Sequence, residues 1–229
     1  DPSTYEHVPP EAVGNERVIP MSGQAGRSNL LRQLSEAGIE VDRDDPRLAP
    51  LLAEVKAREE QGFNYDQAAA SFALLAHKHL GSLPRFFEVD RYRVSVERRF
   101  NAMGARVTAS EAVVVVHVDG RRMISASESI DPVTKEDQGP VNALARALQK
   151  DLGGYQRHIE DLRLVDFKVR IIGAGTEAVT RVLLDSTDGE GNLWSTLGVS
   201  ANIVDASFQA LEDAVVYKLM QAGARPADG

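Results

Sequence analysis

One stretch of the chain has the glycine spacing of a phosphate-binding loop. It reads VRIIGAGTEA from Val169, so a strand-like run leads into Gly173, Gly175 and Ala178. A dinucleotide fingerprint needs a helix directly after the loop, because the N-terminus of that helix faces the pyrophosphate. The residues that follow, 179–184, are rich in β-branched side chains and predict a strand. We therefore interpret the loop as a hairpin connection and expect no nucleotide site there.

Histidines are the next candidates, because His77 and His79 resemble a metal-binding pair. Helical ligands that share a face are three or four residues apart, whereas these two are separated by only two. The chain has no cysteine, and it shows no nucleophile elbow, no phosphate loop with Lys-Ser/Thr and no paired catalytic carboxylates. We therefore expect no catalytic residue, metal or cofactor in this chain.

A glycine-containing loop from Ser22 to Asn29 is the remaining candidate. Its backbone N–H groups and Arg27 could meet an anion at the start of the following helix. A capped helix explains the same residues, with Ser28 or Asn29 as the cap. The sequence leaves both interpretations open.

Composition excludes several classes of protein. Of 229 residues, 43% are hydrophobic and 26% are charged, which is typical of a globular protein. The net charge is −8, with no long basic run, so we expect no nucleic-acid partner. No apolar stretch approaches the roughly 18 residues of a membrane span, and no signal-peptide pattern opens the chain. Because the first residue is Asp1 and not methionine, we expect a fragment of a longer protein.

The elements that would carry a binding site form a repeat. In the last third, Phe167, Val169 and Ile171 alternate with polar residues, which predicts a strand with one buried face. Two further strand-like runs follow, separated by an Asp-Gly turn, and after Gly198 the apolar residues recur at helical spacing. The stripe of small residues Ala206, Ala210 and Ala214 would let another backbone approach this helix closely. We expect this stripe to lie in a dimer contact.

The same unit occurs earlier in the chain. Tyr92, Val94 and Val96 alternate with polar residues, and the hairpin signal Asp119-Gly120 separates the next two runs. The helix that follows reads PVNALARAL from Pro140 and agrees with IVDASFQAL from Ile203 at four positions. Two copies of a βββα unit predict an α+β fold with a pseudo-twofold axis.

Three helices are expected before the repeats. They span residues 30–37, 45–61 and 66–80, with Asp45 capping the second at Pro46 and Asp66 capping the third. Leu83-Pro84 breaks the chain, so we expect a boundary near residue 84. From the residues alone, the chain is a helical linker followed by a ligand-sensing or dimerising module.

Seven stretches occur in the order found in one enzyme family. They are TYEHVPPEAVGNER (from Thr4), AGRSNLL (from Ala25), GFNYDQAAASFALL (from Gly62), VDFKVRI (from Val165), TRVLLDSTDG (from Thr180), STLGVSANIVDASFQAL (from Ser195) and YKLM (from Tyr217). Together they resemble the C-terminal region of the 2-isopropylmalate synthase and citramalate synthase family. The first three resemble the citramalate synthase type more than the leucine-pathway type.

This resemblance implies three parts: residues 1–44 and 45–84 as linker subdomains I and II, and residues 85–229 as a regulatory domain of two βββα repeats. The full enzyme of the family condenses acetyl-CoA with a 2-oxo acid, which is pyruvate in the citramalate type, in a barrel that binds a divalent metal. That barrel is absent here, so we expect this chain alone to be inactive. The linker is implied to support the active site of the neighbouring subunit.

The resemblance also implies an effector pocket for the end-product amino acid. Its parts fall on the start of the first repeat's helix, on the first and second strands of the second repeat, and before the last helix: Val141, Asn142, Leu164, Phe167, Ile171, Ala178, Thr180, Ser200 and Asn202. Phe167 replaces a tyrosine common in the family, which removes a hydroxyl group but keeps an apolar wall. Read from strand alternation alone, Leu164, Phe167 and Ile171 would simply be core residues.

The implied partners are a second copy of the chain and a branched-chain amino acid. The citramalate type implies a cytoplasmic homodimer that binds isoleucine, and the alternative is a 2-isopropylmalate synthase that binds leucine. An interpretation from another class is a stand-alone, small-molecule-sensing dimerisation module.

Overall fold

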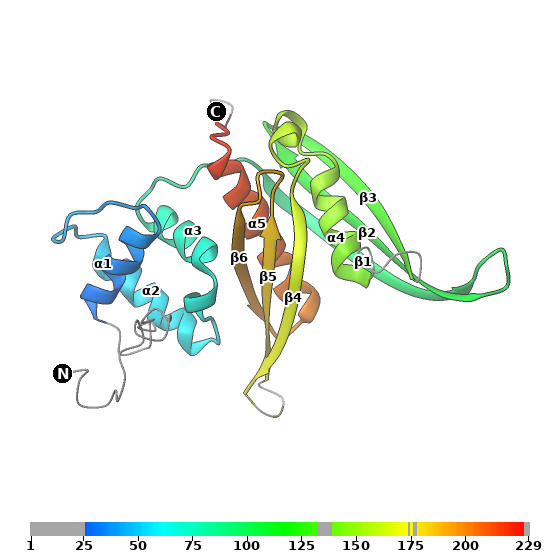
Figure 1. The fold of residues 1–229 in the computed structure, drawn as a ribbon, viewed down its shortest axis with the longest axis horizontal. Helices are drawn as coiled ribbons and strands as arrows, with labels where there is room; N and C mark the ends of the chain where they lie inside the picture. Colours follow the sequence, from blue (N-terminus) through cyan, green and yellow to red (C-terminus); the bar gives the residue numbers. More distant parts are fainter. Residues whose placement is uncertain (1–25, 132–138, 174, 176–177, 227–229) are drawn as a thin grey trace.

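The protein consists of a helical linker followed by two repeats of three strands and a helix (Figure 1). The structure, a computed structural model, describes residues 26–131, 139–173, 175 and 178–226. The linker contains α1 (Arg27–Glu36), α2 (Leu48–Glu60), the short 3-10 helix η3 (Tyr65–Gln67) and α3 (Ala69–His79).

Both repeats have the predicted order of elements. The first contains β1 (Glu88–Phe100), β2 (Arg106–Val118), β3 (Arg121–Asp131) and α4 (Gly139–Lys150), and the second contains β4 (Arg163–Ile172), β5 (Val179–Thr187), β6 (Leu193–Ser200) and α5 (Ile203–Gln221). The 3-10 helix η4 (Gly153–His158) joins them. Each repeat forms its own antiparallel sheet, in the order β1-β2-β3 and β4-β5-β6. The α+β fold with two βββα repeats is therefore confirmed.

Details of the strand pairing also agree between the two units. The first strand of each repeat has an irregularity in register at the same place, between Val89 and Arg91 in β1 and between Leu164 and Asp166 in β4. In the β2–β3 hairpin, Asp119 and Gly120 have φ values of 48° and 73°, as a tight two-residue turn requires.

The main core lies between the two sheets and is filled by α4 and α5. Side chains of β2 and β5, such as Val114, Val116 and Leu184, pack with Leu148 of α4 and Leu211 of α5 in one buried cluster. Helix α5 has buried residues around most of its circumference, whereas α4 turns one apolar face to this core and leaves Arg146 and Lys150 exposed. The two repeats consequently share one core.

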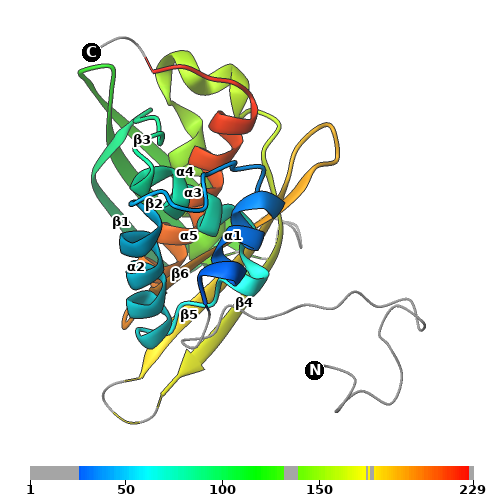
Figure 2. The same cartoon turned by 90° about the vertical axis from the view of Figure 1, so that its left-hand side faces the viewer.

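The linker forms a second core against the outer face of the second sheet (Figures 1 and 2). Leu34, Leu51 and Phe72 of the three linker helices cluster with Leu197 and Val199 of β6. The Arg181 guanidinium of β5 donates a hydrogen bond to the Gly62 carbonyl oxygen. The second sheet is therefore covered by α5 on one face and by linker residues on the β6 side of the other.

Two helix starts differ from the sequence-based expectation. Helix α1 begins after Gly26, and neither Ser28 nor Asn29 caps it. Helix α2 begins at Leu48, because Asp45 accepts a hydrogen bond from the Arg47 N–H group and forms a turn before the helix. The predicted caps at these positions were therefore wrong.

The start of the third helix also differs. Asp66 lies inside η3, whose cap is the Asn64 side chain, and α3 begins only at Ala69. These polar side chains bond the backbone locally, and several turn geometries satisfy the same spacing.

The alanine stripe of α5 does not face a partner molecule. Ala206, Ala210 and Ala214 are buried within the chain, and a Cβ atom added to Gly198 of β6 would lie 2.0 Å from the Ala206 carbonyl oxygen. Thr196 donates a hydrogen bond to the Ala210 carbonyl oxygen at 2.7 Å. The stripe is needed for the close packing of α5 on β6, and its expected place in a dimer contact was wrong.

Candidate functional site

Three of the expected effector residues lie in one row across the second sheet. Ile171 of β4 pairs with Thr180 of β5, and Thr180 pairs with Ser200 of β6. Phe167 lies on the same face of β4, opposite Leu184 of β5. The strand register thus gathers residues from positions 167 to 200 on one face.

The exposure of these side chains contradicts the interpretation that they are core residues. Ile171 is 76% exposed and Phe167 is 37% exposed, whereas Leu164 is half-buried and packs against the core. The alternation predicted the face correctly, but α5 lies over β5 and β6 and leaves the far half of β4 uncovered. Ala178, which precedes β5, is half-buried.

The residues before α5 are engaged in capping that helix. The Asn202 side chain accepts a hydrogen bond from the Val204 N–H group at 2.8 Å, and Ser200 Oγ accepts one from the Asn202 N–H group. An Asn cap satisfies one of the free N–H groups of the first turn. A ligand carboxylate at this helix start would have to accept hydrogen bonds from the remaining free N–H groups of the first turn.

The pseudo-twofold axis relates the start of α4 to the start of α5, where a side chain of β1 packs against the helix. There, the Tyr92 ring of β1 stacks on Phe208 of α5 with ring centroids 3.9 Å apart, and its hydroxyl group donates a hydrogen bond to Asp205. Burial, followed by the nearby Asp205 carboxylate, raises the pKa of Tyr92.

In the half formed by β4 and the start of α4, the equivalent positions carry smaller or less polar side chains. Counted from the strand irregularity, Phe167 corresponds to Tyr92. By alignment of the two helices, Asn142 corresponds to Asp205 and Ala145 to Phe208. The hydroxyl–carboxylate pair and the second aromatic ring are therefore absent from this half. Val141 and Asn142 are half-buried, and Val141 packs against the core.

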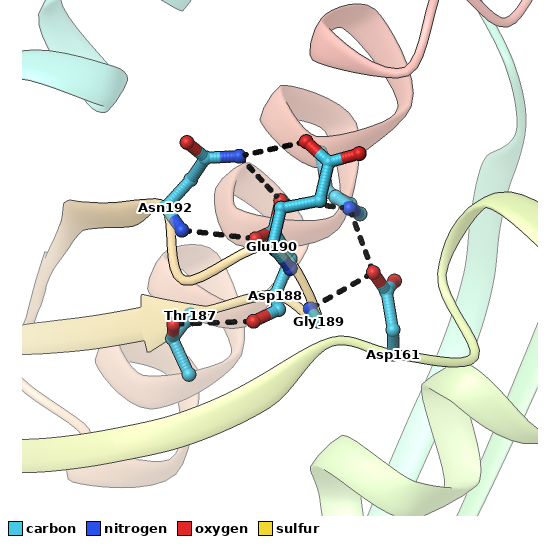
Figure 3. A network of polar contacts seen from close by, with 7 residues as sticks. Asp161, Thr187, Asp188, Gly189, Glu190 and Asn192 are labelled. Atoms are coloured by element: carbon cyan, nitrogen blue, oxygen red, sulfur yellow. Dashed lines mark hydrogen bonds and ion pairs between the residues drawn. The ribbon is translucent and has the colours of Figure 1, made fainter.

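A buried lysine, Lys218 of α5, bonds both the segment before β4 and the β5–β6 turn, whose residues Asp161 and Asp188 are labelled in Figure 3. Lys218 of α5 forms ion pairs with Asp161, which precedes β4, at 3.1 Å and with Asp188 of the β5–β6 turn at 2.9 Å. Asp161 also accepts a hydrogen bond from the Gly189 N–H group, and the Asp188 carboxylate holds its own turn through Asn192.

The charges in this network stabilise one another. Hydrogen bonds from Asn192 and Lys218 lower the pKa of Asp188. Burial opposes the charge of Lys218, but the bonds from its ammonium group to Asp188 and Asp161 raise its pKa. Each charge has an opposite partner, as a buried ionic group requires. We assign this cluster a structural role, because its groups are already paired.

The other candidates from the sequence carry no chemistry in the described part of the chain. A strand and not a helix follows Gly173 and Gly175, which have positive φ values, so the hairpin interpretation is confirmed; residues 174, 176 and 177 lie outside the described residues. Residues 22–25 of the anion-loop candidate lie outside as well. His77 lies within hydrogen-bonding distance of Ser82, and burial lowers its pKa.

Within the described ranges there is no group of three His, Asp or Glu side chains that could hold a metal ion. In the same residues, no helix is long and apolar enough to cross a membrane.

Besides the Lys218 network, the sequence analysis missed a polar cluster between the linker and the second repeat. Ser71 of α3 donates a hydrogen bond to Asp213 of α5 at 2.5 Å and accepts one from the Leu197 N–H group of β6 at 3.0 Å. A signal was present, since the adjacent acids Glu212 and Asp213 interrupt an apolar helix. Its importance depends on residues that are more than 100 positions away in the chain.

The curated relatives of this chain are larger enzymes. An (R)-citramalate synthase of Aquifex aeolicus is 43% identical over 220 residues, which cover 95% of this chain and 39% of that protein. An (R)-citramalate synthase of Geobacter sulfurreducens is 41% identical with the same coverage. A 2-isopropylmalate synthase of Methanocaldococcus jannaschii is 26% identical over 93% of this chain and 37% of its own length. The chain thus spans about two fifths of the length of these relatives.

A family description agrees with both the repeats and the relatives. The family described as the LeuA allosteric (dimerisation) domain matches residues 66–219, which include α3 and both βββα repeats apart from the last residues of α5. This match covers more than half of the chain, and the chain therefore belongs to the LeuA allosteric (dimerisation) domain family.

Proposed function

We propose that this chain is the linker and regulatory portion of a citramalate synthase that condenses acetyl-CoA with pyruvate and is inhibited by isoleucine. The observation that carries the proposal is the difference in identity: 41–43% to two (R)-citramalate synthases, against 26% to a 2-isopropylmalate synthase over nearly the same residues. In such an enzyme the divalent metal and the general base belong to a catalytic barrel outside these residues.

The effector site in this proposal lies at the pseudo-twofold equivalent of the Tyr92–Phe208 contact. Phe167 and Ile171 supply exposed apolar surface on β4, which suits a branched aliphatic side chain. The amide oxygen of Asn142 accepts a hydrogen bond from the ligand ammonium group, and the start of α5 near Ser200 and Asn202 receives the carboxylate. Ala145 stands where the other half has Phe208, so this position lacks the ring that stacks on Tyr92, which supports the choice of this place for the ligand.

A substrate assay on the full-length enzyme tests the proposed reaction. We expect acetyl-CoA consumption with pyruvate and little with 2-oxoisovalerate. The reverse preference would assign the chain to a 2-isopropylmalate synthase, with leucine as the effector. If the reading frame contains no barrel with an HxH metal motif, the stand-alone sensing module is the correct interpretation. The present chain alone should show no consumption above a no-protein control.

Calorimetry on this chain tests the effector. We expect isoleucine to bind more tightly than leucine or valine. One methylene in a fitted pocket, which separates valine from isoleucine, contributes about 1–3 kcal/mol, whereas leucine is distinguished by the position of its branch. Replacing Asn142 with Leu should abolish this binding and leave the oligomeric mass unchanged. Tighter binding of leucine than of isoleucine would contradict the assignment.

The same proposal includes a homodimer. Its support is the family description together with apolar side chains that the chain itself leaves uncovered on β4, namely Val165, Phe167, Val169 and Ile171. A contiguous exposed apolar strand in a globular protein is typical of an interface. A second copy of the chain would cover it.

A further inference from the structure

The linker bonds the free edge of the second sheet. β6 is the last strand in the order β4-β5-β6, so the N–H groups that point away from β5 have no strand to bond. Two of them bond side chains: the Leu197 N–H group donates to Ser71 Oγ at 3.0 Å, and the Val199 N–H group donates to Gln209 Oε1 at 3.1 Å. Ser71 belongs to α3 of the linker, whereas Gln209 belongs to α5 of the same repeat.

The contact through Ser71 continues to a carboxyl group of α5. Ser71 Oγ accepts the bond from Leu197 and donates its own proton to Asp213 Oδ2 at 2.5 Å. A hydroxyl group has one proton, so Ser71 has no second hydrogen bond to donate. Ser71 is only 5% exposed, and Asp213 is half-buried. One buried hydroxyl group thus joins the linker to both β6 and α5.

The surroundings of Asp213 offer little to its charged form. The ionisable groups that share its cavity come from four elements: Glu212 of α5, Arg58 of α2, Tyr65 of η3 and Lys78 of α3. β6 carries no ionisable side chain. The positive charge that acts on Asp213 is that of Arg58, whose guanidinium group is already bonded to Glu54 at 2.7 Å. Burial raises the pKa of Asp213 to about 7, and the bond from Ser71 and the charge of Arg58 oppose this only in part.

Detachment of the linker would change these surroundings. Apart from α5 itself, the groups around Asp213 belong to the linker and to β6, so water would reach the carboxylate once the linker had moved away. Water stabilises an ionised carboxylate better than a partly buried site does. The main core would remain, because of the described linker helices only α3 contributes a buried residue, Ala70, to it. Ionisation of Asp213 therefore favours the detached linker without requiring the repeats to unfold.

We infer that the contact between Ser71 and Asp213 is a pH-sensitive switch, which holds the linker on the second repeat while Asp213 is protonated and lets it detach more readily once Asp213 is ionised. The detached state has the lower pKa, because its carboxylate is hydrated. The equilibrium for detachment therefore increases as pH rises from 3.8, the ordinary value for aspartate, to about 7, and it levels off above that. This inference does not rest on the proposed enzyme or on its effector.

Amide hydrogen exchange of the 229-residue chain, followed by NMR at pH 6 and pH 8, tests the switch. The Leu197 N–H group reports on the linker, because its acceptor is Ser71. The Val199 N–H group on the same edge is the internal reference, because its acceptor Gln209 belongs to the repeat. After correction for the intrinsic pH dependence of exchange, we expect protection of Leu197 to fall about tenfold and that of Val199 to change less than about twofold.

Asp213→Asn tests whether this carboxyl group is the cause. The amide oxygen can still accept the bond from Ser71, but the side chain cannot ionise, so protection of Leu197 should be equal at pH 6 and pH 8. The matched control is Asp185→Asn, because Asp185 accepts a hydrogen bond from Ser195 at 2.5 Å within the second sheet. This control should keep the tenfold fall at Leu197.

The wild-type chain alone still tests the inference if Asp213→Asn does not fold. The carbon-13 signal of the Asp213 carboxyl group should titrate with a midpoint near pH 7, and protection of Leu197 should level off above that midpoint. A midpoint near pH 4 overturns the inference, as does pH-independent protection of Leu197. An equal fall at Leu197 and Val199, or a fall at Leu197 that persists in Asp213→Asn, overturns it as well.

Discussion

At the scale of single residues, the surroundings of Asp213 strongly favour its protonated form. It lies on α5 beneath the linker and accepts a hydrogen bond from Ser71. Burial, with the charge of Glu212, raises its pKa from 3.8 to about 7, while Ser71 and the Arg58 charge oppose the shift. Asp213 also lines a cavity of about 270 Å³ between the linker and the second repeat.

This shift predicts a loss of stability as pH rises. Between pH 4 and 7 the folded chain keeps a proton on Asp213 that the unfolded chain has released, so the free energy of unfolding falls as pH rises across this window. Asp213→Asn keeps the bond to Ser71 but cannot ionise. We expect its urea midpoint to change less between pH 5 and pH 8 than that of the wild-type chain.

A matched substitution shows whether the effect is specific to Asp213. Asp44 is exposed in the connection before α2, and Asp44→Asn should reproduce the pH dependence of the wild-type chain. Equal slopes for the wild-type chain and Asp213→Asn would contradict the assigned pKa.

At the scale of elements, α5 contacts more of the molecule than any other described helix. It packs on β5 and β6, on α4 and on α3, and its side chains take part in the main core and border the linker core. The contact with β6 is the closest, because Gly198 leaves space for the Ala206 carbonyl group. The position of α5 therefore depends on a residue without a side chain.

Gly198→Ala should destabilise the chain strongly. The added Cβ atom would lie 2.0 Å from a backbone oxygen, and backbone cannot move aside as a flexible side chain can. Overpacking a core typically costs about 1–3 kcal/mol, and a backbone clash belongs at the upper end or above it. Urea denaturation measures the loss.

The control for this substitution is Gly154→Ala in η4, where no atom lies within 4 Å of the added Cβ atom and φ is not positive. It should change the free energy of unfolding by less than about 0.5 kcal/mol. Wild-type stability in Gly198→Ala would show that α5 packs on β6 less closely than described here.

At the scale of the whole molecule, the first strand of each repeat extends beyond the helix that covers its sheet. Val96 and Phe100 of β1 are exposed, as are Val169 and Ile171 of β4. The chain has no further described element to cover them. This arrangement is the physical basis for the proposed dimer.

Ile171→Lys should weaken that dimer. Ile171 is 76% exposed in the single chain, so a lysine costs little there, but in an interface it would be desolvated without a partner. Ultracentrifugation at micromolar concentration should give about twice 24.9 kDa for the wild-type chain and a mass nearer to 24.9 kDa for the variant.

Leu193→Lys is the matched control for this experiment, since Leu193 is 71% exposed at the start of β6, away from β4. It should remain dimeric. A wild-type mass near 24.9 kDa would contradict the dimer itself, and a dimeric Ile171→Lys variant would place the interface elsewhere.

The sequence alone determined the features that depend on near neighbours. Alternation from Phe167 to Ile171 predicted β4 and the face that its side chains share, and Asp119-Gly120 predicted the β2–β3 turn. The similarity of the helices that begin near Pro140 and Ile203 predicted the repeat. Each of these signals arises within a few residues, because strand pleating, helical spacing and turn backbone angles are local properties.

Only the tertiary structure decided what covers each face. The alanine stripe at Ala206 faces β6 and not a partner, and Ile171 is exposed although its pattern is that of a buried strand. The cavity near Asp213 takes its lining from five elements that lie far apart in the chain, including η3 and β6. Burial is the sum of contacts with distant segments, and a local pattern carries no information about which segments those are.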